Sequence, residues 1–342
     1  MKHNALISVV VPAYNEQEVL GEFHRRLVAV LAQLPVRREV VYVNDGSSDA
    51  TLAVMHGLRE ADGSVCVVDL SRNFGKEIAL SAGLDHARGD AIIVIDADLQ
   101  DPPELIPELI KHWQQGCDVV YAQRMKRLGE SALKRLTAYG FYRVMQSMGR
   151  VKIPQDTGDF RLLSRRALDA LNQLREQHRF MKGLFTWIGY KQHAVPYQRD
   201  SRFAGVTKWN YWKLWNLALE GITSYTIAPL KISTYIGLFT AFGAFAYGSY
   251  IVVRTLIFGN NVPGYPSLLT VMLFLGGVQL MAIGVLGEYV GRIFNETKNR
   301  PLYLLSSYAP ARETLQQQQL PSTSVSSASL TENVPAPRVE SV

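Results

Sequence analysis

The chain reads IDADLQDPP at residues 95–103, and this stretch decides the fold. The apolar run Ala91–Ile95 leads into it and predicts a buried strand that ends where the acids begin. Asp96 and Asp98 point to the same side of an extended chain, and Gln100 continues that side. Two carboxylates and an amide oxygen suit Mg²⁺ or Mn²⁺. An acidic loop that only caps the helix after the prolines is the plainer alternative. The carboxyl end of a strand, however, is where open α/β sheets bind ligands.

Further apolar runs predict the rest of an α/β sheet. The predicted strands are Leu6–Val11, Val40–Val43, Val65–Leu70, Val119–Ala122 and about 191–199. Four helical patterns follow these strands. The first covers about 17–34, the second begins after the turn at 44–49, the third ends at about residue 87, and the fourth covers about 103–115. Strands that alternate with helices indicate a mostly parallel sheet with helices on both faces. Each polar loop follows a strand, so we expect these loops along one edge of the sheet.

The composition narrows the class of protein. A net charge of +6 is spread over 342 residues, without the clustered basic and aromatic motif of a nucleic-acid-binding protein. Cys66 and Cys117 are the only cysteines, and the apolar run around Cys66 favours a buried, reduced thiol over a disulfide or metal site. The first apolar run is too short for a cleavable signal peptide. We therefore expect no nucleic-acid partner.

The loops carry a family resemblance. In chain order they read PAYNE at 12–16, NDGSSD at 44–49, SRNFGK at 71–76 and DADLQDPP at 96–103. Together they resemble glycosyltransferase family 2 with the Rossmann-like GT-A fold, and the last motif is similar to that of dolichol-phosphate mannose synthases. With DTGDFR at 156–161, RFMKG at 179–183 and two apolar spans, the set resembles bactoprenol (undecaprenyl-phosphate) glucosyltransferases. The resemblance covers about residues 5–305.

The resemblance implies a nucleotide-sugar site. Pro12, Tyr14 and Glu16 would frame the base and ribose, and Asp45 would hydrogen-bond the uracil ring. The family often has a second acid where this chain has Asn44. Packing is the plainer interpretation of Tyr14.

The resemblance also implies catalytic and metal-binding residues. Asp96 would lie beside the ribose and the metal, with Asp98 and Gln100 as metal ligands. Asp156 and Asp159 are the candidates for orienting the acceptor or taking a residual proton. A structural role is the alternative for both, and Asp156 could cap a turn.

Basic residues suggest an acceptor-phosphate site. Arg124 lies just past a predicted strand end and is expected to contact phosphate, although the basic stretch 124–135 could simply be a solvated helix face. Arg202 and Lys208 flank Gly205 in a predicted flexible turn, which suits a clamp on phosphate. The resemblance agrees, because this turn looks like the family's acceptor loop. An ordinary surface loop is the alternative.

The C-terminal third predicts membrane association. Aromatic and apolar residues recur at helical spacing over 209–228, which indicates an amphipathic helix in the interface rather than a core helix. Two spans follow at about 232–253 and 268–290, each long enough to cross a bilayer. Lys231 precedes the first, and Arg292, Lys298 and Arg300 follow the second, which puts the catalytic domain and C-terminus in the cytoplasm. Arg254 counts against this orientation. Glycines in the second span favour homo-oligomers.

These observations give one expected domain plan. The catalytic domain covers 1–207, the interfacial helix 208–230 and the two spans 231–294. A cytoplasmic tail covers 295–342 and is disordered from about 309. The protein is expected to be multi-pass in the bacterial inner membrane.

The expected activity is inverting transfer of glucose from UDP-glucose to undecaprenyl phosphate. A divalent metal would assist, and a flippase and a second membrane glycosyltransferase would use the product. A 4-deoxy-4-formamido-L-arabinose transferase acting on the same lipid is the alternative within the class. A non-catalytic membrane scaffold is the alternative outside it, although such a scaffold is expected to have lost the acids, and Asp45, Asp96 and Asp98 are present.

Overall fold

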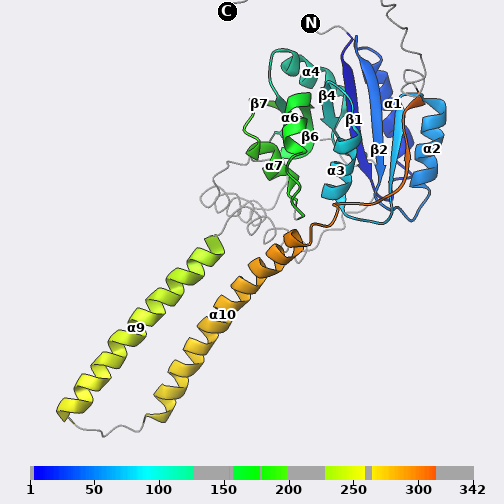
Figure 1. The fold of residues 1–342 in the computed structure, drawn as a ribbon. Coiled ribbons are helices and arrows are strands. Elements are labelled where there is room, and N and C mark those ends of the chain that lie inside the picture. The colour runs from blue at the N-terminus through cyan, green and yellow to red at the C-terminus, as the bar shows by residue number, and fades with distance from the viewer. Residues whose placement is uncertain are drawn as a thin grey trace, which may run out of the picture.

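A mixed sheet with helices on both faces forms the body of the protein, and two long helices extend from it (Figure 1). The computed structural model describes residues 4–125, 154, 157–177, 179–198, 228–258 and 264–312. The predicted interfacial helix lies outside these residues, except that 228–230 belong to the first long helix.

The sheet has eight strands in the order β7-β5-β6-β4-β1-β2-β3-β8. Their bounds are β1 Leu6–Ala13, β2 Arg37–Asn44, β3 Val65–Leu70, β4 Ala91–Val94, β5 Val119–Arg124, β6 Thr157–Ser164, β7 Gln192–Tyr197 and β8 Leu305–Ala309. The parallel pairs are β1 with β2 and β4, β2 with β3, and β5 with β7. The predicted α/β fold and its mostly parallel sheet are thus confirmed.

Two strands, β6 and β8, were missed from the sequence, and both run antiparallel to their neighbours. β6 is buried along its whole length although it contains Asp159 and Arg161, and these charges hid its strand character. β8 is largely exposed and is held by backbone pairing with β3. The domain plan therefore needs a correction, because 305–309 belong to the catalytic sheet and not to a tail.

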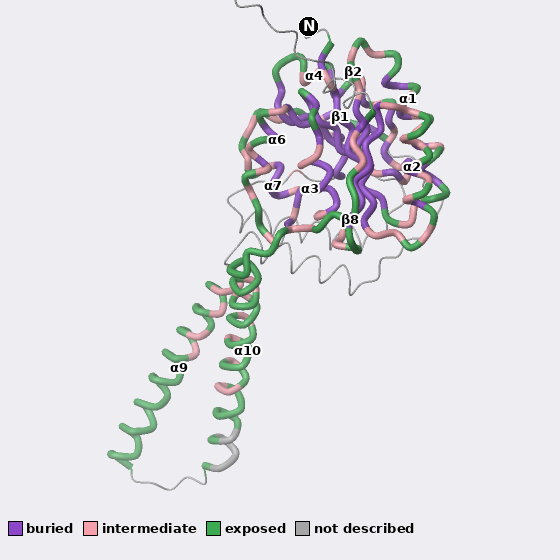
Figure 2. The backbone as a smooth tube through the Cα atoms, turned by 45° about the vertical axis from the view of Figure 1, so that its right-hand side comes forward, coloured by how far each residue is buried: buried purple, intermediate pink, exposed green. Residues whose placement is uncertain are grey.

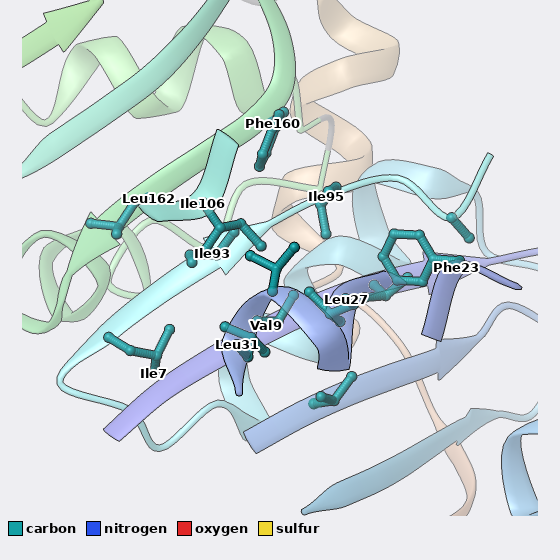
Figure 3. Packing of buried hydrophobic residues seen from close by; sticks show 14 of the residues in the cluster. Ile7, Val9, Phe23, Leu27, Leu31, Ile93, Ile95, Ile106, Phe160 and Leu162 are labelled. Carbon is teal, nitrogen blue, oxygen red and sulfur yellow. The ribbon is translucent and has the colours of Figure 1, made fainter. Parts of the chain in front are cut away.

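The helices pack on the sheet through alternate strand residues. Their bounds are α1 Leu20–Leu31, α2 Thr51–Ala61, α3 Lys76–His86, the 3₁₀ turn η1 Pro103–Leu105, α4 Ile106–Gln114, α6 Arg165–Leu171 and α7 Met181–Trp187. Val9 packs in one buried cluster with residues of α1, α2 and α4, whereas Val10 packs in a second cluster with residues of α3, α6 and α7. Figure 3 shows Phe23 and Leu27 of α1 near Val9. Full burial of one such side chain contributes roughly 1.5–3 kcal/mol.

The long helices are α9, Ala228–Phe258, and α10, Tyr265–Thr297. Within them, Pro229–Phe258 and Thr270–Thr297 are long and apolar enough to cross a membrane, with mean hydropathy of 1.6 and 1.9. Side chains such as Phe239 and Leu256 are exposed, unlike those of a core helix. Figure 2 shows α9 and α10 mostly in the colour of exposed residues. Both helices extend beyond the predicted spans.

The segment after α10 is tied to the catalytic domain at several points. The Ser71 N–H donates to Leu304 O at 2.9 Å, and β8 starts beside the carboxyl end of β3. The Arg59 guanidinium donates to Pro310 O at 2.9 and 3.0 Å. Figure 1 accordingly shows α10 joining the domain on the side to which the parallel strands point.

Gly83 lets α3 lie directly on the sheet. A Cβ atom at this position would clash with Val10 Cγ1 and lie 2.9 Å from Val43 Cγ2. Both neighbours are fully buried strand residues, so neither can move without disturbing the core. This close packing positions α3, whose first residue is Lys76.

We predict that Gly83→Ala destabilises the catalytic domain by about 1–3 kcal/mol through overpacking. Gly57→Ala is the matched control, because Gly57 lies in α2 with nothing within 4 Å of the added carbon. That change should stabilise by roughly 0.5–1 kcal/mol. Denaturant unfolding of the detergent-solubilised protein measures both, and equal effects of the two variants would contradict the packing argument.

Candidate active site

The loops after β1 and β2 lie together at the carboxyl edge of the sheet. Pro12 is buried within β1 beside Val43, whereas Tyr14 is 44% exposed just beyond the strand. The Asn15 side-chain oxygen accepts the Ser48 N–H at 2.9 Å, and the Glu16 N–H donates to Thr51 Oγ1 at 2.8 Å. These bonds hold the predicted base-framing loop against the start of α2.

Asp45 braces the loop at 71–76. Its carboxylate is buried and accepts the Phe74 N–H at 2.7 Å and the Gly75 N–H at 3.1 Å. Burial raises the pKa of Asp45, and these two bonds oppose that rise. Sequence reasoning assigned Asp45 to the uracil ring, and it missed this connection to the residues that precede Lys76.

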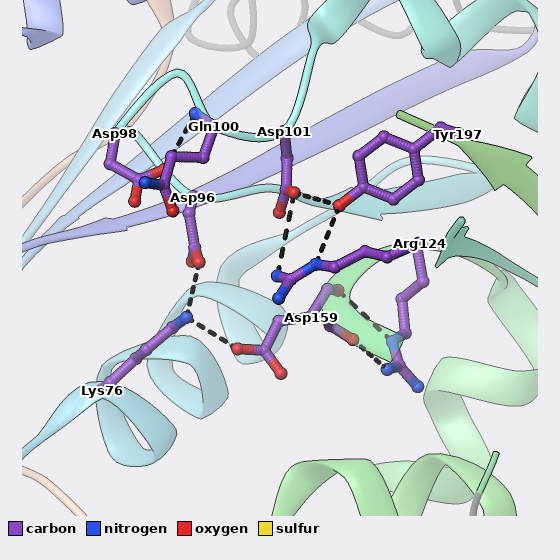
Figure 4. Close-up of polar contacts among 10 residues, drawn as sticks. Lys76, Asp96, Asp98, Gln100, Asp101, Arg124, Asp159 and Tyr197 are labelled. Atoms are coloured by element: carbon purple, nitrogen blue, oxygen red, sulfur yellow. Dashed lines mark hydrogen bonds and ion pairs between the residues drawn. The ribbon is translucent and has the colours of Figure 1, made fainter. Parts of the chain in front are cut away.

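Lys76 links the acids of two neighbouring strands (Figure 4). Its ammonium nitrogen lies 2.7 Å from Asp96 Oδ2, just past β4, and 2.6 Å from Asp159 Oδ2, in β6. The Lys76 side chain is 47% exposed, and those of Asp96 and Asp159 are 23% and 11% exposed. The sequence prediction left Lys76 out, although a lysine that opens a helix after a strand-end loop was a usable signal.

The shared ammonium gives the two carboxylates different proton affinities. Burial raises the pKa of Asp96 despite Lys76. Burial also opposes ionisation of Asp159, but the charges of Lys76 and Lys182 outweigh it and lower the pKa of Asp159. Burial of Lys76 disfavours its charge, yet the two carboxylates raise its pKa. Asp159 is therefore ionised at neutral pH and is a weak proton acceptor.

Asp98 and Gln100 form a tight turn above Asp96 (Figure 4). Asp98 Oδ1 accepts the Gln100 N–H at 3.1 Å, and Leu99 between them adopts a left-handed conformation with φ of 58°. Among the described residues, no group of three His, Cys, Asp or Glu side chains is arranged to hold a metal. Mg²⁺ needs only one or two protein carboxylates beside water and substrate phosphates, so this donor set still fits a hard cation.

Arg124 belongs to a second polar cluster with Asp101 and Tyr197 (Figure 4). Its Nε donates to the Tyr197 hydroxyl at 3.2 Å, and that hydroxyl donates to Asp101 Oδ1. Arg124 Nη2 also lies 4.0 Å from Asp101 Oδ1, and its side chain is only 16% exposed. A Cβ atom at Gly158 would lie 2.9 Å from Arg124 Nη2, so glycine leaves room for the guanidinium. Arg124, the residue predicted to contact phosphate, is thus partly enclosed by its neighbours.

Two buried carboxylate oxygens of the site have no hydrogen-bond partner within the described part of the chain. They are Asp101 Oδ2 and Asp159 Oδ1. A buried acceptor without a donor is costly, so each is a point where a substrate, a water or a moving side chain would be stabilised. The predicted site residues Asp156, Arg202 and Lys208 lie outside the described residues.

The chain belongs to glycosyltransferase family 2, whose profile matches residues 8–171, and it is a glycosyltransferase with the GT-A fold. The GtrB C-terminal hairpin profile matches residues 228–293. The chain is 51% identical over 299 residues to the bactoprenol glucosyl transferase of Shigella phage SfII, with 87% of this chain and 97% of that protein covered. It is 52% identical over 300 residues to an uncharacterized glycosyltransferase of Synechocystis, covering 88% and 94%. The predicted family is confirmed.

We predict that Tyr197→Phe destabilises the protein by about 1–3 kcal/mol, because buried Asp101 loses its hydroxyl donor. Tyr190→Phe removes a hydroxyl outside this cluster and serves as the control. Denaturant unfolding of detergent-solubilised protein measures the difference. Equal, small effects of both substitutions would mean that the Tyr197 hydroxyl is not needed to hold Asp101.

Proposed function

We propose that the protein transfers glucose from UDP-glucose to undecaprenyl phosphate, with inversion at the anomeric carbon. The observation that carries this proposal is the cluster of Lys76, Asp96 and Asp159 at the sheet edge on the side of the two apolar helices. Similarity over almost the whole chain to bactoprenol glucosyl transferases supports the lipid acceptor and the sugar. The 4-deoxy-4-formamido-L-arabinose transferase is the alternative within the same class.

The donor side of the proposed site uses the loops after β1, β2 and β4. Tyr14 is exposed beside the nucleotide position that the family motif implies, with Pro12 and Glu16 next to it. Asp98 and Gln100, with Asp96, would hold Mg²⁺ or Mn²⁺. When bound, the metal neutralises charge on the departing diphosphate.

The proposed reaction is one displacement. An oxygen of the lipid phosphate attacks the anomeric carbon, and the bond from that carbon to the diphosphate oxygen breaks with its electron pair leaving on UDP. A phosphomonoester loses its second proton near a pKa of ~6, so the nucleophile is already largely anionic. Because Lys76 and Lys182 keep Asp159 ionised, Asp159 orients groups in this scheme and Asp156 remains the candidate for a residual proton.

The acceptor side of the proposed site uses positive charge. Arg124 lies at the end of β5 near the start of β6. Arg202 and Lys208, which lie outside the described residues, are proposed as further contacts to the lipid phosphate because they flank Gly205 in the sequence. The lipid bilayer, a flippase and a second membrane glycosyltransferase are the proposed partners, and a homo-oligomer is the proposed assembly. We place the catalytic domain on the cytoplasmic face of a bacterial inner membrane.

We predict that purified protein transfers label from UDP-glucose to undecaprenyl phosphate when it is offered a panel of radiolabelled nucleotide-sugars. Asp98→Asn should abolish transfer and weaken metal-dependent donor binding, because a carboxylate ligand is lost.

Arg202→Ala should slow transfer by roughly ten- to a hundredfold and leave donor affinity unchanged, because a charge-assisted phosphate contact contributes about 1.5–3 kcal/mol.

Each arm of this experiment has its own contradicting result. Transfer of a different sugar would show that UDP-glucose is not the donor, and transfer of none of the sugars would show that the proposed activity is wrong. Wild-type turnover by Asp98→Asn at saturating Mn²⁺ would remove the metal assignment. Loss of donor affinity in Arg202→Ala would move that residue from the acceptor to the donor side.

For the orientation, we predict that Asn261→Cys is labelled by an impermeant thiol reagent in cells with a permeabilised outer membrane. Ser307→Cys on the exposed side of β8 should stay unlabelled until the inner membrane is opened. Cys66 and Cys117 are buried and give little background. The reverse labelling pattern would invert the orientation.

A further inference from the structure

We propose that Lys76 is a positioning residue that competes with the divalent cation for Asp96 and moves wholly onto Asp159 when the cation binds. The inference rests on the proposed function, because it concerns the metal subsite of the same donor site. In this scheme the ammonium is a resident counter-cation that keeps the acids neutralised until donor and metal arrive.

The first support is the position of the ammonium. It lies 2.7 Å from Asp96 Oδ2, and Asp96 is the acid that follows β4 in the motif implied to bind metal. A divalent cation on this carboxylate would lie within a few ångströms of a second positive charge. Like charges that close repel strongly at a partly buried site, so the cation and Lys76 cannot share Asp96 without cost.

The second support is the unequal freedom of the backbone and side chain of Lys76. Its backbone follows Phe74 and Gly75, whose N–H groups are fixed by Asp45. Its side chain is 47% exposed and lies on flexible methylene carbons. The ammonium can therefore change partner while the helix stays in place.

The third support is a place for the ammonium to go. Asp159 Oδ2 already accepts from Lys76 at 2.6 Å, and Asp159 Oδ1 is buried with no hydrogen-bond partner among the described residues. An ammonium that leaves Asp96 has a donor hydrogen to give to this second oxygen. Metal binding at Asp96 would then complete the hydrogen bonding of Asp159, which links the donor site to the carboxylate of β6.

The test measures metal binding directly. Free Mn²⁺ is counted by electron paramagnetic resonance as it is titrated into the full-length protein without donor or lipid. Lys76→Met and Lys76→Gln remove the competitor and should tighten Mn²⁺ binding roughly two- to fivefold, the range expected for loss of a half-exposed ion pair. Both should also slow glycosyl transfer, because Asp159 loses its partner.

Two controls keep the charge argument specific. Lys76→Arg retains the positive charge and should leave Mn²⁺ affinity near the wild-type value. Lys111→Met removes a positive charge from the exposed last turn of α4 and should leave both Mn²⁺ affinity and transfer unchanged. A change with Lys111→Met equal to that with Lys76→Met would reduce the effect to net charge and overturn the inference.

The inference and the proposed function fail in different ways. If wild type binds Mn²⁺ and transfers sugar, but Lys76→Met binds Mn²⁺ equally or more weakly, Lys76 does not compete for the site and the inference alone is overturned. If wild type binds no Mn²⁺, the metal assignment in the proposed function is wrong, and the inference is overturned with it. Circular dichroism of each variant separates a changed site from a misfolded protein.

Discussion

The candidate active site depends on one positive charge, the Lys76 ammonium, held between two carboxylates. Asp96 follows β4 and Asp159 lies in the adjacent, antiparallel strand β6. Their carboxylates would repel each other without the Lys76 ammonium. α3 brings the Lys76 ammonium to the same edge of the sheet, where it offsets this repulsion. The close approach of α3 to β1 and β2 at Gly83 thus contributes to the electrostatics of the site as well as to the core.

The loops around this charge brace one another through side-chain bonds to backbone. Asp45 of the β2 loop holds the N–H groups that precede Lys76, and Asn15 of the β1 loop holds Ser48. Each bond joins segments that are far apart in sequence but leave neighbouring strands. Such bonds reduce the reorganisation that a charged donor would require on binding. They also explain why several polar residues of the motifs are buried.

The fold could be predicted where an apolar run in the sequence corresponds to a buried strand in the sheet. The continuous apolar runs in β1 and β2 predict strands that are buried on both faces, and Val9 and Val10 indeed pack in opposite clusters. Asp96 and Asp98 mark the end of the strand that precedes them. β6 escaped prediction because the charged residues Asp159 and Arg161 lie inside a buried strand, and β8 because LSSYA relies on backbone pairing. The family motif indicated Asp96 and Asp159. The motif at 71–76 ends at Lys76, but a local motif does not report that the Lys76 ammonium contacts Asp159 of β6, which is distant in the sequence.

The chain returns to pair with β3 only after α10, so the catalytic sheet is completed late in synthesis. A ribosome releases β1 to β7 first, then α9 and α10, and only afterwards the residues of β8. One edge of β3 therefore stays uncovered while the residues between Leu70 and Leu305, both apolar helices among them, are translated. At ~5–20 residues per second this takes on the order of ten to fifty seconds. An uncovered strand edge pairs readily with foreign chains. Completion of the catalytic sheet is thus tied to the biogenesis of the helical hairpin, and a stalled hairpin leaves the newborn enzyme open to aggregation.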